Sequence, residues 1–370
     1  MLPEVREAMT EVMERDFGNP SSVHDLGRRA RRAVEDARDR VAAAIGASPA
    51  EVCFTGSGTE ADNLAIKGAA SKLRGNGDHL VTTTFEHHAV LDSVAWLERG
   101  GMRATYVPPG PDGVIDAARI AEATERATTV ASVMAVNNEI GTVQPVAAVA
   151  EAVKESNGRA LVHTDAVQAL GNIPVDVAAW GVDLAAFAAH KLGGPKGVGA
   201  LFVRSHTPVE AIIHGGGQER GLRSGTLDVA GIAGFGVAAE IAAKEIHEKA
   251  ERLLDLRTKL WDGIRERVAG VALNGDWDQR VAGNLNFSVQ GADGETLLLL
   301  LDQAGIACSS GSACASGALD PSHVLLAIGT ARDLAAASLR MTLGRSSVEA
   351  DVDAALDALP GIVERARRVG

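Results

Sequence analysis

The sequence predicts an α/β fold, in which a large domain with a mainly parallel sheet is joined to a smaller α+β domain. Three observations lead to this prediction. Over the first part of the chain, short apolar runs rich in β-branched residues alternate with stretches of helical periodicity. Most of these runs are bounded by Gly, Asp or Asn, which are typical of turns. After about position 229 the rhythm changes, and 370 residues are enough for two domains.

The elements of the large domain follow in order along the chain. Strands are predicted at 51–55, 79–84, 103–107, 129–136, 160–164, 182–187 and 198–203, and helices at 25–45, 60–73, 89–99, 116–126 and 146–156. Strands separated by helices pair in parallel through right-handed crossovers, which places a functional site at their carboxyl ends. A Gly-rich loop rather than a helix separates the last two strands, which allows an antiparallel strand there.

The smaller domain is predicted from the remaining elements. Helical periodicity covers 229–268, 295–304 and 348–367, and strands are expected at 271–273, 284–289 and 338–342. We expect the large domain to cover 16–230 and the small one to combine 1–15 with 231–370. The most apolar run, 297–301, is far shorter than the about 20 residues that a membrane span needs, so it is expected to be the buried stripe of a helix.

Composition restricts the classes of function. The 36 Lys and Arg residues against 48 Asp and Glu give a net charge of −12, which argues against a nucleic-acid-binding surface. An odd count of three cysteines in a long chain makes no disulfide framework and fits a reducing compartment. The N-terminus has charges throughout and lacks the apolar core of an export signal. We therefore expect a cytoplasmic enzyme without a membrane span.

The first candidate site is the segment TGSGTEA at 55–61, which follows a strand and opens a helix. Backbone N–H groups at such a turn, together with the helix dipole, form a cradle for an anion. The letters also match the dinucleotide pattern G-x-G-x-x-A, but Asp78, which has the spacing of the required acid, lies before its strand rather than at its end. A phosphate site is the favoured interpretation, with a plain tight turn and a dinucleotide site as alternatives.

The second candidate is a pair of strand ends, HTDAVQ at 163–168 and AAHKLGGPKG at 188–197. A lysine in apolar surroundings, such as Lys191, has a lowered pKa and can form a Schiff base. A carboxylate at a neighbouring strand end, such as Asp165, could hold a pyridinium nitrogen protonated, which pyridoxal phosphate needs as an electron sink. The alternative is a lysine that merely reaches solvent.

Further polar positions carry weaker signals. Adjacent His87 and His88 point to different sides, so at most one would serve a site; zinc is disfavoured because no further His or Cys lies nearby at ligand spacing. Asn138 follows an apolar strand, and the Gly-rich loop 214–226 is compatible with ordinary loop chemistry.

The three thiols differ in their surroundings. Cys53 lies within a strand and Cys308 ends an apolar run, so both are expected to be packing residues. Cys314 lies among small polar residues in an expected exposed loop, where a free thiol is a liability unless it is used. We therefore expect chemistry at Cys314.

At this point the motifs together resemble a known family. GSGTEADNLAIKG, EHHAVLDS, VNNEIGTVQP, HTDAVQALG, HKLGGPKGVGAL, HGGGQERGLRSGT, SSGSACASG and SLRMTLGR occur in the order found in cysteine desulfurases of the NifS/IscS-like type. These are class V aminotransferase-like enzymes of fold-type I that bind pyridoxal 5'-phosphate (PLP). The resemblance runs from about Val5 to the C-terminus, and the SSGSAC loop is similar to that of the long-loop, group I branch.

The resemblance implies roles at the cofactor. Lys191 would bind PLP as a Schiff base and move the α-proton of bound L-cysteine, Asp165 would pair with the ring nitrogen, and His87 would stack on the ring and assist proton transfer. The other implied contacts are from Gly58, Thr59 and His190 to the phosphate, Gln168 to the ring hydroxyl, and Asn138 near that oxygen and the substrate carboxylate.

It also implies a dimer and a sulfur carrier. Thr226 would reach the phosphate of the second subunit, so that a homodimer completes each site. Arg340 would bind the substrate carboxylate through two hydrogen bonds. Cys314 would attack the substrate sulfur and pass the resulting persulfide to an acceptor protein for iron–sulfur cluster assembly or tRNA thiolation. No metal, membrane or direct nucleic-acid partner is implied.

Two departures from the family pattern keep alternatives open. Ala188 stands three residues before the lysine, where the family usually has Ser or Thr as a phosphate donor. The chain also lacks the short N-terminal strand of its relatives, so we expect that the numbering begins at an internal methionine or that the natural chain was truncated. The alternatives are a selenocysteine lyase, another class V aminotransferase, or a catalytically weak sulfur-assembly scaffold.

Overall fold

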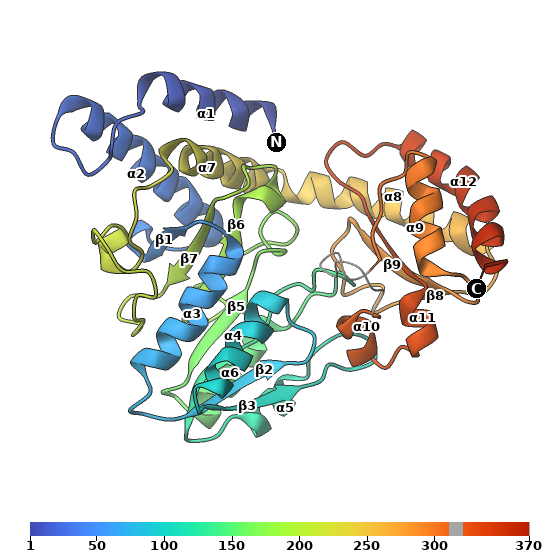
Figure 1. The fold of residues 1–370 in the computed structure, drawn as a ribbon, viewed down its shortest axis with the longest axis horizontal. Coiled ribbons are helices and arrows are strands. Elements are labelled where there is room, and N and C mark those ends of the chain that lie inside the picture. The colour runs from blue at the N-terminus through green and yellow to red at the C-terminus, as the bar shows by residue number, and fades with distance from the viewer. Residues whose placement is uncertain (311–320, 370) are drawn as a thin grey trace. The chain divides into compact units, whose positions relative to one another are not determined.

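The computed structural model describes residues 1–310 and 321–369. The chain forms two compact units (Figure 1). The larger unit contains Met1–Val107, Asp116–Val136 and Pro145–Ile246, and the smaller unit contains Pro108–Ile115, Asn137–Gln144 and His247–Gly370. The segments Pro108–Ile115 and Asn137–Gln144 thus belong to the smaller unit. The sequence prediction had placed both of them in a continuous large domain over 16–230.

A seven-stranded sheet in the order β1-β7-β6-β5-β4-β2-β3 forms the centre of the larger unit. Its strands are β1 (Val52–Thr55), β2 (His79–Thr83), β3 (Arg103–Val107), β4 (Thr128–Ser132), β5 (Leu161–Asp165), β6 (Leu184–Ala188) and β7 (Gly199–Val203). All neighbouring pairs are parallel except the two that β7 makes with β1 and β6. The predicted mainly parallel sheet is confirmed, and the strand after the Gly-rich loop is antiparallel.

Helices pack around this sheet (Figure 1). They are α1 (Pro3–Arg15), α2 (Asp25–Ile45), α3 (Gly58–Lys72), α4 (His88–Arg99), α5 (Ala117–Ala123), α6 (Val146–Ser156) and α7 (Val229–Lys244), with short 3-10 turns η1 (Pro49–Glu51), η2 (Ala189–Leu192) and η3 (Glu219–Gly221). The alanine-rich face of α3 is buried in a core with Cys53, Leu184 and Leu201 of the sheet. Small side chains on α3 let the helix approach the strands closely, which brings its N-terminus to the strand ends.

Residues 1–15 lie in the larger unit, which differs from the prediction that they join the smaller domain. Their helix α1 packs on α7, where a Cβ on Gly234 would lie 2.8 Å from the Met9 side chain and 3.2 Å from Val5. Val5 and Val12 are buried on this face. The close approach depends on the glycine, so contacts distant in sequence rather than any local pattern fix where α1 belongs.

The smaller unit is built on an antiparallel sheet in the order β10-β9-β8. Its elements are α8 (Ile246–Arg267), β8 (Val271–Leu273), β9 (Asn284–Val289), α9 (Gly294–Gln303), α10 (His323–Ala327), α11 (Arg332–Ala336), β10 (Ser338–Thr342) and α12 (Glu349–Arg367). Its core joins leucines of α8, α9 and α12 to Phe287 of β9, whose ring centroid lies 5.9 Å from that of Trp261. The predicted α+β character is thus observed.

Two expectations about the helices have different outcomes. The apolar run 297–301 does form a half-buried helix, α9, with Leu297 and Leu301 buried and Leu299 exposed. The single helix expected over 229–268 is instead two helices, because α7 ends at Lys244 and α8 begins at Ile246. Among the described residues, no helix is both long and apolar enough to cross a membrane.

Candidate active site

Lys191 lies in the turn η2 that follows the buried strand β6. The turn ends at Gly193, whose φ of 80° is in the left-handed region that favours glycine, and the Gly193 carbonyl accepts a hydrogen bond from the Leu2 N–H. Both Lys191 and the preceding His190 are exposed. The partial burial of the His190 ring lowers its pKa, and the charges of Lys191 and Lys196 lower it further. The lysine is therefore presented at the carboxyl end of β6.

Asp165 ends the neighbouring strand β5 and is buried. Because β5 and β6 are parallel, their carboxyl ends lie at the same edge of the sheet. Burial raises the pKa of Asp165; a hydrogen bond from the Val167 N–H and the charges of His87 and Lys191 act in the opposite direction. The structure thus brings Asp165, His87 and Lys191 together. The sequence predicted this closeness for Asp165 and Lys191.

His87 is half-buried at the N-terminus of α4, where its Nδ1 accepts a hydrogen bond from the Ala89 N–H at 3.1 Å. This cap fixes the imidazole and leaves its Nε2 edge directed away from the helix backbone. His88 is exposed, and its Nδ1 lies 3.8 Å from Asp92. The two adjacent histidines thus differ in exposure and in their partners.

The predicted anion cradle is the N-terminus of α3. Ser57 caps the helix by accepting a hydrogen bond from the Glu60 N–H at 3.0 Å, and Gly58 is the first helical residue. A Cβ on Gly58 would lie only 2.5 Å from Cγ2 of Val167, so glycine is needed where the helix meets the segment after Asp165. Thr59 is exposed. The contact with Val167 therefore places the cradle next to the segment that follows Asp165.

Two predicted cofactor residues of the larger unit lie in loops. Gln168 is half-buried in the turn after Asp165, and its carbonyl accepts a hydrogen bond from the Asn172 side chain. Thr226 is exposed and follows Gly225, whose φ is 123°. The Gly225 N–H donates to Gln218 Oε1 at 2.8 Å, which fixes the loop just before Thr226.

Asn138 and Arg340 lie together in the smaller unit. Arg340 is in β10, and its Nη1 donates to the Asn138 carbonyl at 2.9 Å. Its Nε and Nη2 make no hydrogen bond to the described residues. The Oδ1 atom of Asn138 is buried without a hydrogen-bond partner in the described part of the chain. A polar ligand could accept hydrogen bonds from the guanidinium of Arg340 and donate one to Asn138 Oδ1.

Ser309 connects Arg340 to the segment that carries the thiol. The Arg340 N–H donates to the Ser309 carbonyl at 2.6 Å, and the Ser309 N–H donates back to the Arg340 carbonyl at 3.2 Å. This bridge was not predicted, because strand pairing by a single residue leaves no periodic signal. The predicted nucleophile, Cys314, lies outside the described residues.

The chain matches a known family model and named relatives over nearly its whole length. The aminotransferase class-V model matches residues 1–355. An "IscS-like cysteine desulfurase" of Mycobacterium tuberculosis is 48% identical and spans 100% of this chain and 95% of its own. A "Cysteine desulfurase IscS" of Clostridium botulinum is 46% identical and spans 99% and 92%. A solved "NifS-like protein" superposes with a TM-score of 0.93 at 37% identity, covering 99% and 96%.

The chain belongs to the class-V aminotransferase family. Within that family it is similar to the cysteine desulfurases, and the predicted fold class and resemblance are thereby confirmed. The family's fold-type I architecture accounts for the mostly parallel sheet of the larger unit.

Two thiols of this class-V family member are packing residues, as predicted. Cys53 is fully buried in β1, and burial raises the pKa of its thiol to about 12. Cys308 is half-buried against the core of the smaller unit, and burial raises its thiol pKa to about 11. Neither thiol is therefore ionised near neutral pH, which leaves them poor nucleophiles.

Sequence reasoning missed several buried polar residues near the strand ends. Asp62 of α3 and Glu86 of the β2–α4 turn are buried with His163 of β5. A polar residue inside an apolar strand pattern, such as His163, is a signal that could have found this cluster. In the smaller unit, the side chains of Asn284 and Asn286 both donate to the Glu139 carbonyl, which fixes the turn that carries Asn138.

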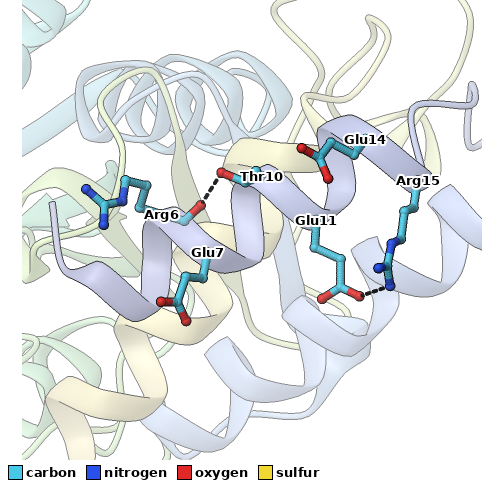
Figure 2. A pocket seen from close by; sticks show the side chains of 6 residues that line it. All are labelled: Arg6, Glu7, Thr10, Glu11, Glu14 and Arg15. Atoms are coloured by element: carbon cyan, nitrogen blue, oxygen red, sulfur yellow. Dashed lines mark hydrogen bonds and ion pairs between the residues drawn. The ribbon is translucent and has the colours of Figure 1, made fainter.

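A surface hollow on α1 lies apart from the predicted site residues. It is lined by Arg6, Glu7, Thr10, Glu11, Glu14 and Arg15, all on α1 (Figure 2). The side chains that Figure 2 labels all come from this one helix, and none is a predicted site residue. Among the described residues, no group of three His, Cys, Asp or Glu side chains is arranged to hold a metal ion.

Proposed function

We propose that this enzyme is a PLP-dependent cysteine desulfurase that converts L-cysteine to L-alanine and carries the sulfur as a persulfide on Cys314. The observation that carries the proposal is the environment of Asp165, a buried carboxylate at a strand end whose ionised form is favoured by its interactions with His87 and Lys191. A buried acid near a histidine and a lysine suits a cationic ring nitrogen. The relatives named cysteine desulfurase supply the reaction class.

The residues present fit PLP. The anion cradle of α3, with Gly58 and Thr59, suits the phosphate, and His190 would add a donor. Lys191 would hold the cofactor and then take and return the substrate's α-proton at its Nζ. When bound, the cofactor supplies an electron sink for the substrate's α-carbon. Gln168 would donate to the ring hydroxyl of the cofactor. Asn138 would lie near the same hydroxyl, and its Oδ1, which lacks a partner in the described chain, would accept a hydrogen bond from the ligand.

Substrate binding would fall to the smaller unit. Arg340 has one nitrogen held by the Asn138 carbonyl and would offer Nε and Nη2 to the carboxylate of L-cysteine. Lysine in its place could not offer two parallel hydrogen bonds. Arg340→Lys is therefore expected to raise KM for L-cysteine much more than it lowers the amount of bound cofactor.

Sulfur transfer would use Cys314 as a thiolate. It would attack the substrate sulfur; the C–S bond breaks, the carbon keeps the electron pair and takes a proton, and L-alanine leaves. The enzyme thiol and L-cysteine together become an enzyme persulfide and L-alanine, so atoms and electrons balance. A carrier thiol must leave the cofactor to meet an acceptor, which favours a loop position.

The partners follow from the same scheme. We propose a homodimer in which Thr226 of each subunit binds the phosphate of the cofactor held by the other. The acceptor would be a protein of iron–sulfur cluster assembly or tRNA thiolation. The few thiols of the sequence suit a reducing compartment, and we propose that the enzyme acts in the cytoplasm.

Mass spectrometry after exposure to L-cysteine tests the proposal. The Cys314 peptide should gain the mass of one sulfur atom, and L-alanine should appear in equal amount. Lys191→Ala should abolish both the yellow colour and L-alanine formation. Cys314→Ala should keep the colour and bind L-cysteine but form no persulfide. Sulfide release by Cys314→Ala at the wild-type rate would refute the role of Cys314 and favour a lyase or an aminotransferase.

A further inference from the structure

Asp62 of α3 and His163 of β5 face each other inside the larger unit. Asp62 Oδ1 lies 3.4 Å from His163 Nε2, and the two residues are only 1% and 0% exposed. Neither atom makes a regular hydrogen bond within residues 1–310 and 321–369. The other ring nitrogen, Nδ1, lies 2.8 Å from the hydroxyl of Ser132 on β4. The scheme proposed above uses neither Asp62 nor His163.

The pair lies next to Asp165. His163 and Asp165 are two residues apart on β5, so their side chains project from the same face of the sheet. Burial raises the pKa of Asp62 well above its usual range, and the charges of Asp165 and Glu86 raise it further. Three buried carboxyl groups thus act on one another, and they cannot all be ionised at low cost.

The surroundings decide which carboxyl group carries the charge. At Asp165, the hydrogen bond from the Val167 N–H and the interactions with His87 and Lys191 act against the effect of burial. For Asp62, burial and both neighbouring carboxylates favour the protonated form. Glu86 is also buried and accepts hydrogen bonds from the Thr83 hydroxyl and the Met134 N–H. Lys191 therefore favours the ionised form of Asp165, whereas the groups that act on Asp62 are both carboxylates.

The histidine is neutral in this setting. Burial lowers the pKa of His163 to about 3. A neutral imidazole has one donor and one acceptor nitrogen. If Asp62 is protonated, its O–H donates to Nε2, and the Nδ1–H donates to Ser132 Oγ. This arrangement gives every facing atom a partner and adds no charge next to Asp165.

We propose that protonated Asp62 and neutral His163 form an uncharged hydrogen-bonded pair that is a positioning element for Asp165, leaving Asp165 as the carboxylate that carries the charge opposite the cofactor ring. The identity of that ring rests on the proposed function, whereas the protonation of the pair does not. An ionised Asp62 would repel the charge of Asp165 and make that residue harder to ionise.

Nuclear magnetic resonance of ring-labelled histidine in the holoenzyme tests the protonation directly, with His163→Gln to assign the signal. The His163 ring should show a neutral pattern with its proton on Nδ1 from about pH 5 to about pH 9. A His163 signal that titrates in this range, or that shows a doubly protonated ring, overturns the proposal. The outcome is independent of whether the enzyme desulfurates L-cysteine.

Substitutions test the effect on the site through the bound cofactor's absorbance. Asp62→Asn keeps an uncharged donor of equal size facing Nε2, whereas Asp62→Ala leaves that nitrogen unpaired. The visible absorbance of the bound cofactor is followed as a function of pH. Asp62→Asn should leave the midpoint of its change at the wild-type pH, and Asp62→Ala should shift that midpoint by about one pH unit or more. Thr164→Val, which removes a buried hydroxyl from the opposite face of β5, is the matched control and should keep the wild-type midpoint.

The absorbance midpoints of the two Asp62 variants can also contradict the proposal. A shift in Asp62→Asn as large as in Asp62→Ala means that the charge of Asp62 is used, and the proposal fails. If Asp62→Ala does not fold, the Asn variant and the histidine signal still decide. A wild-type enzyme that binds PLP but yields no L-alanine from L-cysteine would refute the proposed function while leaving these two measurements meaningful.

Discussion

Arg38 of α2 and Glu219 of η3 form a buried ion pair with two hydrogen bonds, of 2.7 Å from Nη2 to Oε1 and 2.8 Å from Nη1 to Oε2. Glu219 Oε2 also accepts the Phe54 N–H at 2.7 Å. Glu219 and the next residue, Arg220, both have positive φ, which costs energy in residues other than glycine. The ion pair therefore holds a strained turn at the start of the loop that leads to Thr226.

Breaking this pair is expected to destabilise the fold strongly. Arg38→Met leaves the buried carboxylate of Glu219 without this partner, which costs about 3–5 kcal/mol. Glu219→Gln should cost less, because Arg38 keeps its ion pair with Glu35. Urea unfolding of the holoenzyme at fixed PLP concentration measures the loss. Arg28→Gln is the control, because Arg28 and Asp25 form an exposed pair whose removal should cost less than about 1 kcal/mol. Equal stability losses in the buried and the exposed variants would contradict the prediction.

Cys308 is expected to be dispensable for sulfur transfer. Its thiol pKa of about 11 leaves roughly one part in a thousand as thiolate at pH 8. Iodoacetamide labelling of the Cys308 peptide should thus rise about tenfold per pH unit, and Cys308→Ala should still form the persulfide on Cys314. Cys53, which is fully buried, is the internal control and should stay unlabelled in the folded enzyme. A folded Cys308→Ala variant without persulfide would show that Cys308 takes part.

Glu86 is expected to make stability depend on pH. Burial raises its pKa from 4.5 to about 8, so between these values the folded state binds more protons than the unfolded state. Its contribution to stability therefore falls as pH rises through this window, by up to about 1.4 kcal/mol per pH unit. His163, with its lowered pKa, acts in the opposite direction below its usual pKa.

Glu86→Gln isolates this effect, because the amide Oε1 can still accept from Thr83 and Met134. Urea unfolding at about pH 5, 6.5 and 8 should show a flatter loss of stability for the variant than for the wild type. The comparison is between the two proteins, so the contributions of His163 and Asp62 cancel to first order. Identical slopes would mean that Glu86 does not titrate in this window.

Arg223 is expected to matter for cofactor affinity through Glu60. Its Nε lies 2.8 Å from Glu60 Oε1, and the other carboxylate oxygen of Glu60 accepts the Gly56 N–H of the anion cradle. Arg223→Gln leaves a negative charge beside the proposed phosphate site and should raise the Kd of PLP about tenfold. Glu60→Gln combined with Arg223→Gln removes both charges and should recover part of the loss. Equal Kd values for the single and double variants would contradict this.

Local patterns predicted most of the regular structure. The bounds of α2, α6, β3, β8, β9 and β10 agree with the sequence, because apolar periodicity and turn residues act within each segment. The break at Glu245 between α7 and α8 has no Gly or Pro to signal it. The helices α10 and α11 are each too short to show a period. Tertiary packing decides such features.

The site was predictable where chemistry follows a strand end and unpredictable where it depends on distant pairing. Asp165 and Lys191 could be found because each polar residue ends an apolar run. The partner of Arg38 is far along the chain at Glu219, and Asp62 meets His163 only because α3 packs on β5. No single segment contains the information for either contact.

Ala188 is the position where this chain departs from the Ser or Thr that its resemblance to cysteine desulfurases implies. It is buried at the end of β6, and a Cβ built on Gly58 of the anion cradle would lie 3.3 Å from its own Cβ. A hydroxyl there would face the proposed phosphate site. Because hydrogen bonds to charged groups contribute about 1.5–3 kcal/mol, Ala188→Ser should lower the Kd of PLP roughly tenfold after some loss to crowding.

The measurement is PLP binding to the apoenzyme, followed by the return of visible absorbance. Ala188→Thr and Ala188→Val form the matched pair, because they have nearly the same volume and differ in the hydroxyl. Thr should bind PLP more tightly than Val, whatever crowding costs both. If Ser and Thr give no tighter binding than Ala and Val, the phosphate draws its donors from the backbone at the start of α3, and the missing hydroxyl costs this enzyme nothing.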